Sequence, residues 1–599
     1  MKSATVLFLV TLALSFGSAG CSSTPEQRIP RTFDHREMLL DHLEELLDQG
    51  ASGAVVDRLN SGLIGGLLSA PDVGEWMSRV IDAESHRFRI ARVEEDWETV
   101  LQSVDNIRIL LSDPLQVGLE YSPGEELELP ARDEILLWWS LAELDRQEEV
   151  LALYRLLRRS TLDDLSEEQR IAFRHLAERF NNSEALRRLE VSDTDEPILP
   201  EVTSADLLAG TVTVWVNRGM RISGGVGVPD RVIGSGFFVD PRGYVITNYH
   251  VISSEVDPTY NGFSRLYVKL PGRSTERIPA RVVGYDRVFD IALLKVEIDP
   301  PIVMSLSDVR RLVPGERVLA LGSPGGLDST ITSGIVSASG RRFLQIGEAV
   351  QIDAPVNPGN SGGPLVLPDD GQVAAVVFAG IPQFEGVNFV IPAYWIRHFF
   401  PRLFTDGAIV HPWLGVSLHE GSRGLTAVYV VPGSPVQRSG VQVGERLTHI
   451  NGVAVSDMID AQDLILGGRP GSLVVTDWID SSGTEVRRLL ALDQRPFSPV
   501  EDAMKSQPIE ELFPVLFGMN VDELAGSLFG PDYVITDVLP GSIADESSLS
   551  VNDPFSLRNW HVDRDARAAF IQIVIRKRKA GFLETGLQLG AYLETNSFL

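Results

Sequence analysis

The sequence predicts a multidomain protein in which an α-helical N-terminal domain precedes an all-β double barrel and further domains of α+β type. Its 599 residues suggest three to five domains, and a hydrophobic content of 44% is ample for their cores. Apolar residues recur at helical spacing early in the chain, whereas short alternating strands between Gly, Pro and Asp turns fill the centre. A net charge of −29 disfavours binding to a phosphate backbone, so nucleic acid is not an expected partner.

The first 30 residues have the pattern of a lipoprotein leader and tether. The apolar run over residues 4–16 is too short to span a bilayer and is typical of a signal peptide. The ending Ser-Ala-Gly-Cys resembles a lipobox, which predicts a signal peptide over 1–20, a lipidated Cys21 and a tether over 21–30. The alternative is an ordinary secretory signal with a chance cysteine. Cys21 is the only cysteine, so intramolecular disulfides are excluded.

Residues 31–190 have the periodicity of an α-helical domain. Five leucines within residues 34–49 fall on one helix face. Residues 134–159 and 166–189 show similar patterns, and core packing explains their aromatic residues better than a ligand site does. No fixed period repeats across the region, so a helical-repeat array is not favoured. Residues 191–202, rich in Asp, Thr and Pro, are predicted to be a linker.

Three segments in the centre carry residues suited to nucleophilic catalysis. His250 follows a strand-like run, Asp290 precedes another, and Ser361 lies in the stretch Asn-Pro-Gly-Asn-Ser-Gly-Gly. The order His, Asp, Ser, with spacings of 40 (290 − 250) and 71 (361 − 290) residues, allows one barrel to carry His250 and Asp290 and a second to carry Ser361. Glycine-rich stretches are usually only turns, but this context favours a serine nucleophile.

The same glycine-rich stretch predicts an oxyanion site. The amides of Gly359, Asn360 and Ser361 can point inward from a tight turn, where negative charge develops during attack on a carbonyl. Asp290 is expected to orient His250, which takes the proton of Ser361 as it attacks a peptide carbonyl. This chemistry requires no metal and no organic cofactor.

Four further segments accompany the three candidate residues in order. They are Gly-Ser-Gly-Phe-Phe-Val at 234–239, Leu-Gly-Ser-Pro-Gly-Gly-Leu at 321–327, Thr-Ser-Gly-Ile-Val-Ser at 332–337 and Val-Asn-Phe-Val-Ile-Pro at 387–392. Together these segments resemble the protease domain of the HtrA/Deg family of bacterial envelope proteases. The resemblance implies a serine endopeptidase with a chymotrypsin-like double β-barrel over residues 203–405.

The resemblance also implies a specificity pocket. Family members line it partly with a Gly-Ile-Gly-Phe-Ala segment and accept small aliphatic residues. The corresponding positions here are Val387, Asn388 and Phe389, so Asn388 stands where the family has glycine. No acidic residue lies in this segment, which argues against cleavage after Lys or Arg.

A second set of ordered motifs follows His411. Val-Pro-Gly-Ser at 431–434 and Ile-Asn-Gly at 450–452 match landmarks of a PDZ domain, which is predicted over residues 408–495. Such a domain adds an extended C-terminal peptide to a sheet edge and holds its carboxylate with loop amides. Four residues resemble the carboxylate-binding loop: Trp413, Leu414, Gly415 and Val416.

The last region partly repeats this pattern. Leu-Pro-Gly-Ser at 539–542 aligns with the motif at 431–434, with an offset of 108 (540 − 432) residues. Phe-Gly-Met at 517–519 is a candidate peptide-binding loop, but no Ile-Asn-Gly turn follows. Residues 514–599 are therefore predicted to form a degenerate second PDZ-like domain that serves assembly.

The predicted function is that of an envelope serine endopeptidase that degrades or processes unfolded or damaged proteins and is regulated by peptides at its PDZ domain. Expected partners are unfolded or C-terminally exposed polypeptides, the membrane through Cys21 and, by family resemblance, further copies of the chain in a trimer. By resemblance to other lipoproteins, Ser22 does not carry the aspartate of inner-membrane retention, which favours the outer membrane. Two alternatives stay open, a lipoprotein scaffold or chaperone and a dedicated signalling protease with a single partner.

Overall fold

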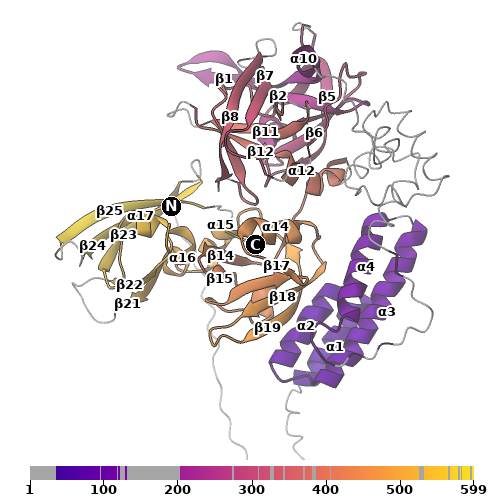
Figure 1. The fold of residues 1–599 in the computed structure, drawn as a ribbon, viewed down its shortest axis with the longest axis vertical. Helices are drawn as coiled ribbons and strands as arrows, with labels where there is room; N and C mark the ends of the chain where they lie inside the picture. Colours follow the sequence, from indigo (N-terminus) through magenta and orange to yellow (C-terminus); the bar gives the residue numbers. More distant parts are fainter. Residues whose placement is uncertain are drawn as a thin grey trace, which may run out of the picture.

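The computed structural model describes most of the chain from residue 35 onward. The described residues are 35–117 except 95, 119, 121, 129–130, and 203–599 except 273–275, 308, 310, 324, 326–329, 342–343, 369–370, 381–385, 405–406, 525–531, 564–566, 578–580, 582 and 594–596. The predicted signal peptide, Cys21, the tether, the helical segments 134–159 and 166–189 and the linker lie outside these residues. The described parts form a helical bundle, a double barrel and two further β-rich domains (Figure 1).

The N-terminal helical region is confirmed by four helices. They are α1 (His35–Asp48), α2 (Ser52–Ile64), α3 (Ala70–Glu94) and α4 (Trp97–Leu111). The predicted helix over 34–49 corresponds to α1, whose Leu43 is fully buried. Asp96 caps α4 by accepting a hydrogen bond from the Thr99 amide at 3.2 Å, which satisfies one of the free donors at a helix start.

Two closed six-stranded barrels confirm the predicted double barrel. The first has the order β1-β2-β3-β6-β5-β4, and the second has the order β10-β11-β12-β9-β8-β7. The strands of the first are β1 (Thr211–Ser223), β2 (Val226–Asp240), β3 (Tyr244–Thr247), β4 (Arg265–Lys269), β5 (Ile278–Asp286) and β6 (Ile291–Val296). The strands of the second are β7 (Arg317–Gly322), β8 (Thr330–Arg341), β9 (Ala349–Ile352), β10 (Pro364–Val366), β11 (Val373–Gly380) and β12 (Asn388–Pro392).

Each barrel has its own core, and a third apolar cluster joins the two. Val214 and Leu294 belong to the core of the first barrel, and Val350 and Val377 belong to the core of the second. The joining cluster contains residues from both barrels and from α12 (Ala393–Phe399), including the fully buried Phe289. This shared cluster holds the two barrels against each other.

The first PDZ-like domain contains a five-strand path in the order β14-β15-β16-β18-β19. Its strand β14 lies at one edge of the sheet, and β13 and β20 form a separate two-stranded sheet. The elements are β13 (Pro412–Trp413), β14 (Val416–Gly421), β15 (Gly424–Val430), α13 (Pro435–Arg438), β16 (Arg446–Ile450), β17 (Val453–Ala454), α14 (Met458–Leu466), β18 (Leu473–Ile479), β19 (Glu485–Ala491) and β20 (Asp493–Gln494).

The second PDZ-like domain repeats a local feature of the first. Gly415 and Gly518 both have positive φ, and a Cβ at either would lie 2.2 or 2.1 Å from the Cβ of Ser434 or Ser542. The two serines belong to the repeated Pro-Gly-Ser motif, so the sequence repeat corresponds to a structural one. Its elements are α15 (Pro499–Ser506), η3 (Ile509–Leu512), α16 (Phe513–Leu516), β21 (Met519–Glu523), β22 (Tyr533–Val538), α17 (Ile543–Glu546), β23 (Pro554–Asp563), β24 (Ala568–Lys577) and β25 (Leu583–Tyr592).

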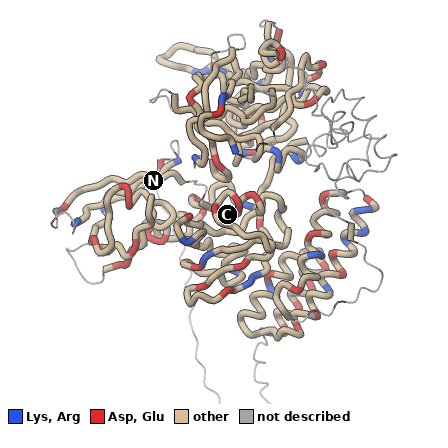
Figure 2. Tube along the Cα trace, viewed as in Figure 1, with Lys and Arg blue, Asp and Glu red and all other residues tan. Residues whose placement is uncertain are grey.

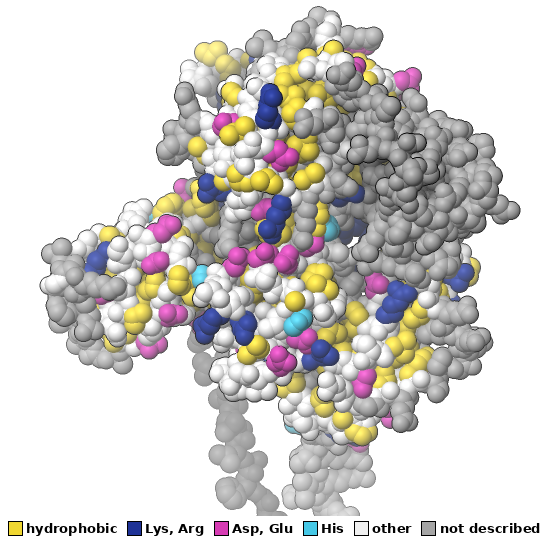
Figure 3. Space-filling model, in the orientation of Figure 1, with side chains coloured by type: hydrophobic (Ala, Val, Ile, Leu, Met, Phe, Trp, Pro, Cys, Tyr) yellow, Lys and Arg dark blue, Asp and Glu magenta, His cyan; other side chains and the backbone are white. Residues whose placement is uncertain are grey.

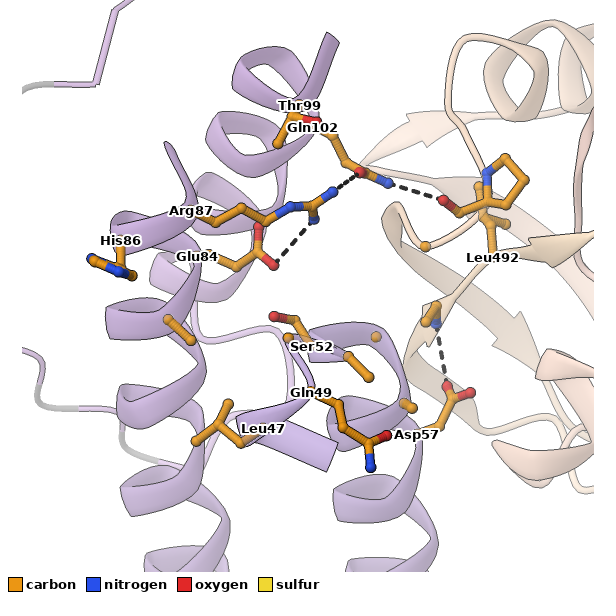
Figure 4. Close-up of a pocket in the computed structure, with 18 of the residues that line it drawn as sticks. Leu47, Gln49, Ser52, Asp57, Glu84, His86, Arg87, Thr99, Gln102 and Leu492 are labelled. Atoms are coloured by element: carbon orange, nitrogen blue, oxygen red, sulfur yellow. Dashed lines mark hydrogen bonds and ion pairs between the residues drawn. The ribbon is translucent and has the colours of Figure 1, made fainter. Parts of the chain in front are cut away.

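The helical bundle docks on the first PDZ-like domain. The Leu473 amide donates to Asn106 Oδ1 at 2.8 Å, and the Ala491 amide donates to Asp57 Oδ1 at 3.3 Å. Leu489 belongs to the same apolar cluster as the bundle core. A pocket of about 1020 Å³ remains beside this contact, where Gln102 bridges to the opposite loop (Figure 4). Buried polar groups on the helices therefore satisfy main-chain groups of the sheet.

A second contact joins the first PDZ-like domain to the double barrel. His411 Nε2 lies 2.6 Å from Asp286 Oδ2, and both side chains are buried. The Gly347 amide donates to Gln462 Oε1 of α14 at 2.9 Å, and Arg495 Nη1 donates to Gln345 Oε1 at 2.9 Å. Figure 3 shows acidic side chains gathered on one face near this junction. The Gln462 bond joins α14 to the segment that leads into β9.

Charged residues are dispersed over the described domains. Figure 2 shows Lys and Arg interspersed with Asp and Glu along the trace, without a continuous basic stripe. Across the described ranges, no helix is long and apolar enough to cross a membrane. Within those same ranges, no group of three or more His, Cys, Asp or Glu residues is placed to hold a metal ion.

Candidate active site

His250 and Asp290 form a closely bonded pair in the first barrel. His250 is the second residue of α11 (Tyr249–Val256), and Asp290 directly precedes β6. The imidazole Nδ1 lies 2.6 Å from Asp290 Oδ2, and the His250 amide donates to Asp290 Oδ1 at 2.7 Å. The Asn248 side-chain amide and the Tyr249 amide both donate to the main-chain oxygen of Asp290, at 2.9 and 3.1 Å. Both ends of Asp290 are therefore held by the turn that carries His250.

Asp290 also has an uncommon backbone conformation. Its φ is 55°, in the left-handed region that residues other than glycine rarely adopt. Aspartate and asparagine are the most frequent exceptions, because their short side chains bond locally. The surrounding hydrogen bonds hold this conformation, as expected at a site where the direction of a side chain matters.

The carboxylate of Asp290 sets the basicity of His250. Burial disfavours the charged ring, but the charge and hydrogen bond of Asp290 outweigh burial, so the pKa of His250 lies above its usual 6.5. The side chain is 45% exposed, which leaves the ring open to a ligand from solvent. His250 is thus oriented and electrostatically prepared to accept a proton at the nitrogen that does not face Asp290.

The loop before β10 carries Ser361 on a tight turn. The Asn360 amide donates to Asn357 O at 2.9 Å, and the Gly362 amide donates to Val377 O at 2.8 Å. Among the described residues, the amides of Gly359 and Ser361 donate to no protein group. Of the three predicted oxyanion donors, the Asn360 amide closes the turn in this structure, and the amides of Gly359 and Ser361 are available to a ligand.

His250 and Ser361 both lie against Phe378. The Ser361 hydroxyl donates to Phe378 O at 3.3 Å, and the rings of His250 and Phe378 have centroids 6.5 Å apart. Both catalytic candidates are described, and no hydrogen bond joins their side chains in this structure. At 3.3 Å, the hydrogen bond from the Ser361 hydroxyl to Phe378 O is longer than the roughly 2.5–3.0 Å that is usual for hydroxyl donors. It is therefore weak and only slightly hinders rotation of the Ser361 side chain toward His250.

Ser235 contacts the loop of Ser361 in a way that the sequence did not reveal. This fully buried serine in β2 donates its amide to Ser361 O at 2.8 Å and its hydroxyl to Gly359 O at 2.6 Å. The Ser323 amide donates back to the Ser235 hydroxyl at 2.9 Å. A Cβ at Gly234 would lie 3.0 Å from Ser361 O, so the neighbouring glycine allows the close approach. The first barrel thereby fixes the loop of the second barrel that carries Ser361.

Replacing Ser235 with alanine is expected to lower kcat by about 100-fold, because displacement of a reacting group by about 1 Å can cost that much. The unfolding free energy should fall by about 1–3 kcal/mol, since Gly359 O and the Ser323 amide lose a buried partner. Turnover of a peptide substrate and thermal unfolding measure the two effects separately.

Thr211→Val is the matched control for this variant. Thr211 is buried in the same barrel and loses a comparable bond, from its hydroxyl to Leu207 O at 2.9 Å, which does not involve the loop of Ser361. It should lose stability but keep kcat. Equal kcat losses in both variants would assign Ser235 a general structural role only.

The predicted specificity residues lie at the start of β12. The Asn388 side-chain amide donates to Ala354 O at 2.9 Å, and Asn388 is only 7% exposed. Phe389 belongs to the apolar cluster between the barrels, and Val387 packs against it. The Asn388 side chain therefore ties β12 to the segment that leads into the loop of Ser361, which a glycine could not do.

The predicted carboxylate-binding loop supplies three converging amides. Those of Leu414, Gly415 and Val416 lie 3.2, 2.8 and 3.4 Å from the main-chain oxygen of Leu599. Trp413 lies in β13 opposite Asp493, with its side chain mostly buried. In the second PDZ-like domain the equivalent amides of Phe517 and Gly518 both donate to Phe513 O at 2.9 Å. In the second domain these amides are therefore hydrogen-bonded to helix α16, whereas in the first domain the equivalent amides bind an extended segment.

Three family models match parts of the chain. The trypsin-like peptidase domain matches residues 234–376, a PDZ domain model matches 426–479 and the TP0546 family PDZ domain matches 500–593. The last match supports a second PDZ domain and begins earlier than the predicted start at residue 514.

Curated relatives cover the barrel and PDZ regions. The "Probable periplasmic serine endoprotease DegP-like" of Marinomonas sp. (strain MWYL1) is 31% identical over 344 residues, which are 55% of this chain and 71% of the relative. The protein of the same name from Hahella chejuensis is 29% identical over 365 residues, or 57% and 74%. The solved structure titled "HtrA-type protease AlgW with tripeptide" aligns with 49% of this chain and 98% of its own, at 25% identity and a TM-score of 0.42.

Proposed function

The chain belongs to the HtrA/Deg family of PDZ-containing serine endoproteases, and on this premise we propose that His250, Asp290 and Ser361 form its catalytic triad. The proposed activity is endoproteolysis of unfolded or damaged polypeptides in the cell envelope, regulated by peptides at the first PDZ domain. The observation that carries the proposal is the Nδ1 to Oδ2 distance of 2.6 Å between His250 and Asp290, beside a serine with two available amides. The periplasmic relatives support the location.

The proposed mechanism begins with rotation of the Ser361 hydroxyl from Phe378 O toward His250. Nε2 of His250 takes the hydroxyl proton as Oγ attacks the substrate carbonyl, and Asp290 stabilises the resulting imidazolium. The amides of Gly359 and Ser361 bind the oxyanion. His250 then gives its proton to the leaving amine, and water enters by the same base catalysis to release the acyl group from Ser361.

Substrate selection is proposed to involve both the barrel and the PDZ domain. The pocket bordered by Val387, Asn388 and Phe389 accepts a small aliphatic side chain, in line with the family. Asn388 reduces the range of substrate side chains that fit this pocket, because its own side chain occupies volume that a glycine would leave free. An extended polypeptide end is held at the first PDZ domain by the amides of Leu414, Gly415 and Val416.

Labelling with a serine-directed fluorophosphonate tests the catalytic proposal. Only a serine whose proton is removed by a neighbouring base reacts rapidly, so the full chain should be labelled at one serine, and peptide mapping should identify Ser361. The Ser361→Ala chain is the matched control and should stay unlabelled. A folded wild-type chain that takes no label and leaves casein intact would support the scaffold alternative.

We also propose that the chain is anchored through a lipidated Cys21, and that the anchor lies in the outer membrane because Ser22 is not the aspartate of inner-membrane retention. The protein expressed from its full sequence should partition into a detergent phase, and Cys21→Ser should move it to the aqueous phase, because acyl chains supply the membrane affinity. Mass spectrometry of the mature N-terminus checks the modification. An unmodified Cys21 in the mature protein would contradict the anchor. Trimer formation, which rests on family resemblance, stays a prediction.

A further inference from the structure

The last three residues of the sequence form an added strand on the first PDZ domain. The Leu418 amide donates to Ser597 O at 2.8 Å, and the Leu599 amide donates to Val416 O at 2.9 Å. Ser417 and Phe598 form an antiparallel bridge between these two bonds. Strand β14 is the edge of its sheet, so residues 597–599 occupy the edge to which an external peptide would add.

The loop that precedes β14 holds the end of this added strand. The amides of Leu414, Gly415 and Val416 converge on the Leu599 oxygen at 3.2, 2.8 and 3.4 Å. These three amides belong to the loop that resembles the carboxylate-binding loop of PDZ domains, which holds the end of a bound peptide. The loop can adopt this shape because Gly415 has a φ of 82° and packs against Ser434, where a Cβ would clash.

The two apolar side chains of the segment enter different cores. Leu599 is only 4% exposed and belongs to the core of the first PDZ domain, together with Val416 and Ile465. Phe598 is 1% exposed, belongs to the core of the second PDZ domain and meets the Tyr429 ring at a centroid distance of 6.3 Å. Successive side chains of a strand point to opposite faces, which explains this division.

The groove is full when this segment is in place. A residual cavity of about 10 Å³, close to the volume that a single water needs, remains beside Phe598 and Leu599. It is lined also by Trp413, Ile465 and Ile346, so the barrel contributes to its wall. An external peptide therefore cannot add to β14 at this position unless residues 597–599 leave.

We propose that residues 597–599 are an internal ligand of the first PDZ domain, which external polypeptide ends must displace. The proposal deepens the peptide regulation described above and rests on it. Because Phe598 also fills the second PDZ core, displacement loosens the contact between the two PDZ domains. The internal segment thus sets a concentration threshold, since a competing intramolecular ligand lowers the apparent affinity by the fraction of time that the groove is free.

The groove lies one helix away from the loop that carries the nucleophile. Leu599 and Ile465 of α14 line the same residual cavity, and Gln462 of that helix accepts the Gly347 amide at 2.9 Å. Strand β9 starts two residues later and leads into the loop of Ser361. Replacement of residues 597–599 by an external peptide therefore changes the contacts of α14, which is hydrogen-bonded to the second barrel.

Binding of a labelled peptide with the sequence of residues 592–599 tests the internal ligand. The assay compares the full Ser361→Ala chain with the same chain lacking residues 597–599, by fluorescence polarisation. If the segment occupies the groove at least 90% of the time, the peptide should bind the shortened chain at least about tenfold more tightly. An amidated peptide should bind it more weakly than the free acid, because the loop amides lose an anionic partner.

Two point variants keep the test decisive where the deletion impairs folding. Leu599→Asp retains Phe598 and should bind the external peptide as the shortened chain does, because a charged side chain is disfavoured in the PDZ core. Leu599→Ile is the conservative control and should behave as the full chain does. Equal affinity of all chains for the peptide, or no binding to any of them, would overturn the proposal. Because Ser361→Ala carries no activity, either result leaves the endopeptidase assignment unaffected.

Discussion

The Ser361→Ala variant is expected to lose cleavage of casein while keeping the fold. Removal of the nucleophile from a serine triad lowers turnover by about 10⁶-fold, and loss of the histidine costs about as much because the residues act as a unit. The Ser361 hydroxyl makes one long bond, to Phe378 O at 3.3 Å, so its loss should change the unfolding free energy by less than about 1 kcal/mol. Turnover and thermal unfolding of the purified chain give the two readings.

Ser253→Ala is the control for loss of a serine hydroxyl near the site. Ser253 lies one turn from His250 on α11, and its hydroxyl donates to His250 O at 3.3 Å, but the proposed mechanism does not use it. This variant should retain wild-type turnover. Retained turnover in Ser361→Ala, with no contaminating protease, would mean that another group is the nucleophile.

The sequence predicted the parts of the site that depend on local patterns. Glycines around Ser361 indicated a tight turn, and strand-like runs placed His250 and Asp290 at strand ends. Which amides remain free could not be read in the same way. Asn360 is as suitable for a turn as its neighbours, but its amide bonds Asn357 O, and only the folded turn decides this.

Contacts between distant segments were beyond the sequence patterns. Ser235 was visible as a serine between glycines, but its bonds to Gly359 and Ser361 depend on how two barrels meet. The docking of Asn106 on the Leu473 amide likewise joins residues far apart in the chain. The second PDZ domain was predicted from its Pro-Gly-Ser repeat, whereas the place of Leu599 in the first domain follows only from tertiary packing.

The second large effect is expected for Asp290→Asn. Asparagine preserves the shape of the side chain and tolerates the φ of 55°, so the backbone should remain as it is. Alanine would add strain at that φ and confuse the result. Loss of the carboxylate removes the group that fixes the His250 tautomer, which costs about 10⁴-fold in kcat in a comparable triad.

The pH profile separates loss of charge from loss of geometry. His250 must be neutral to accept a proton, so kcat/KM should be maximal above its pKa and fall as pH decreases through it. In the wild type this midpoint should lie above 6.5, because Asp290 raises the pKa of His250. In Asp290→Asn the effect of burial remains without the carboxylate, so the midpoint should move to lower pH.

Asp257→Asn is the charge-matched control for the profile. Asp257 is a half-buried residue at the end of α11, and its carboxylate accepts the Thr259 amide at 2.8 Å. Its replacement removes one negative charge, as Asp290→Asn does, but leaves the His250 to Asp290 bond in place, so the midpoint should stay at the wild-type pH. If Asp290→Asn also left the midpoint unchanged, the acid limb would report another group, and the assignment of His250 as the base would fail. A downward shift in Asp290→Asn alone would tie the acid limb to the pair that the structure holds at 2.6 Å.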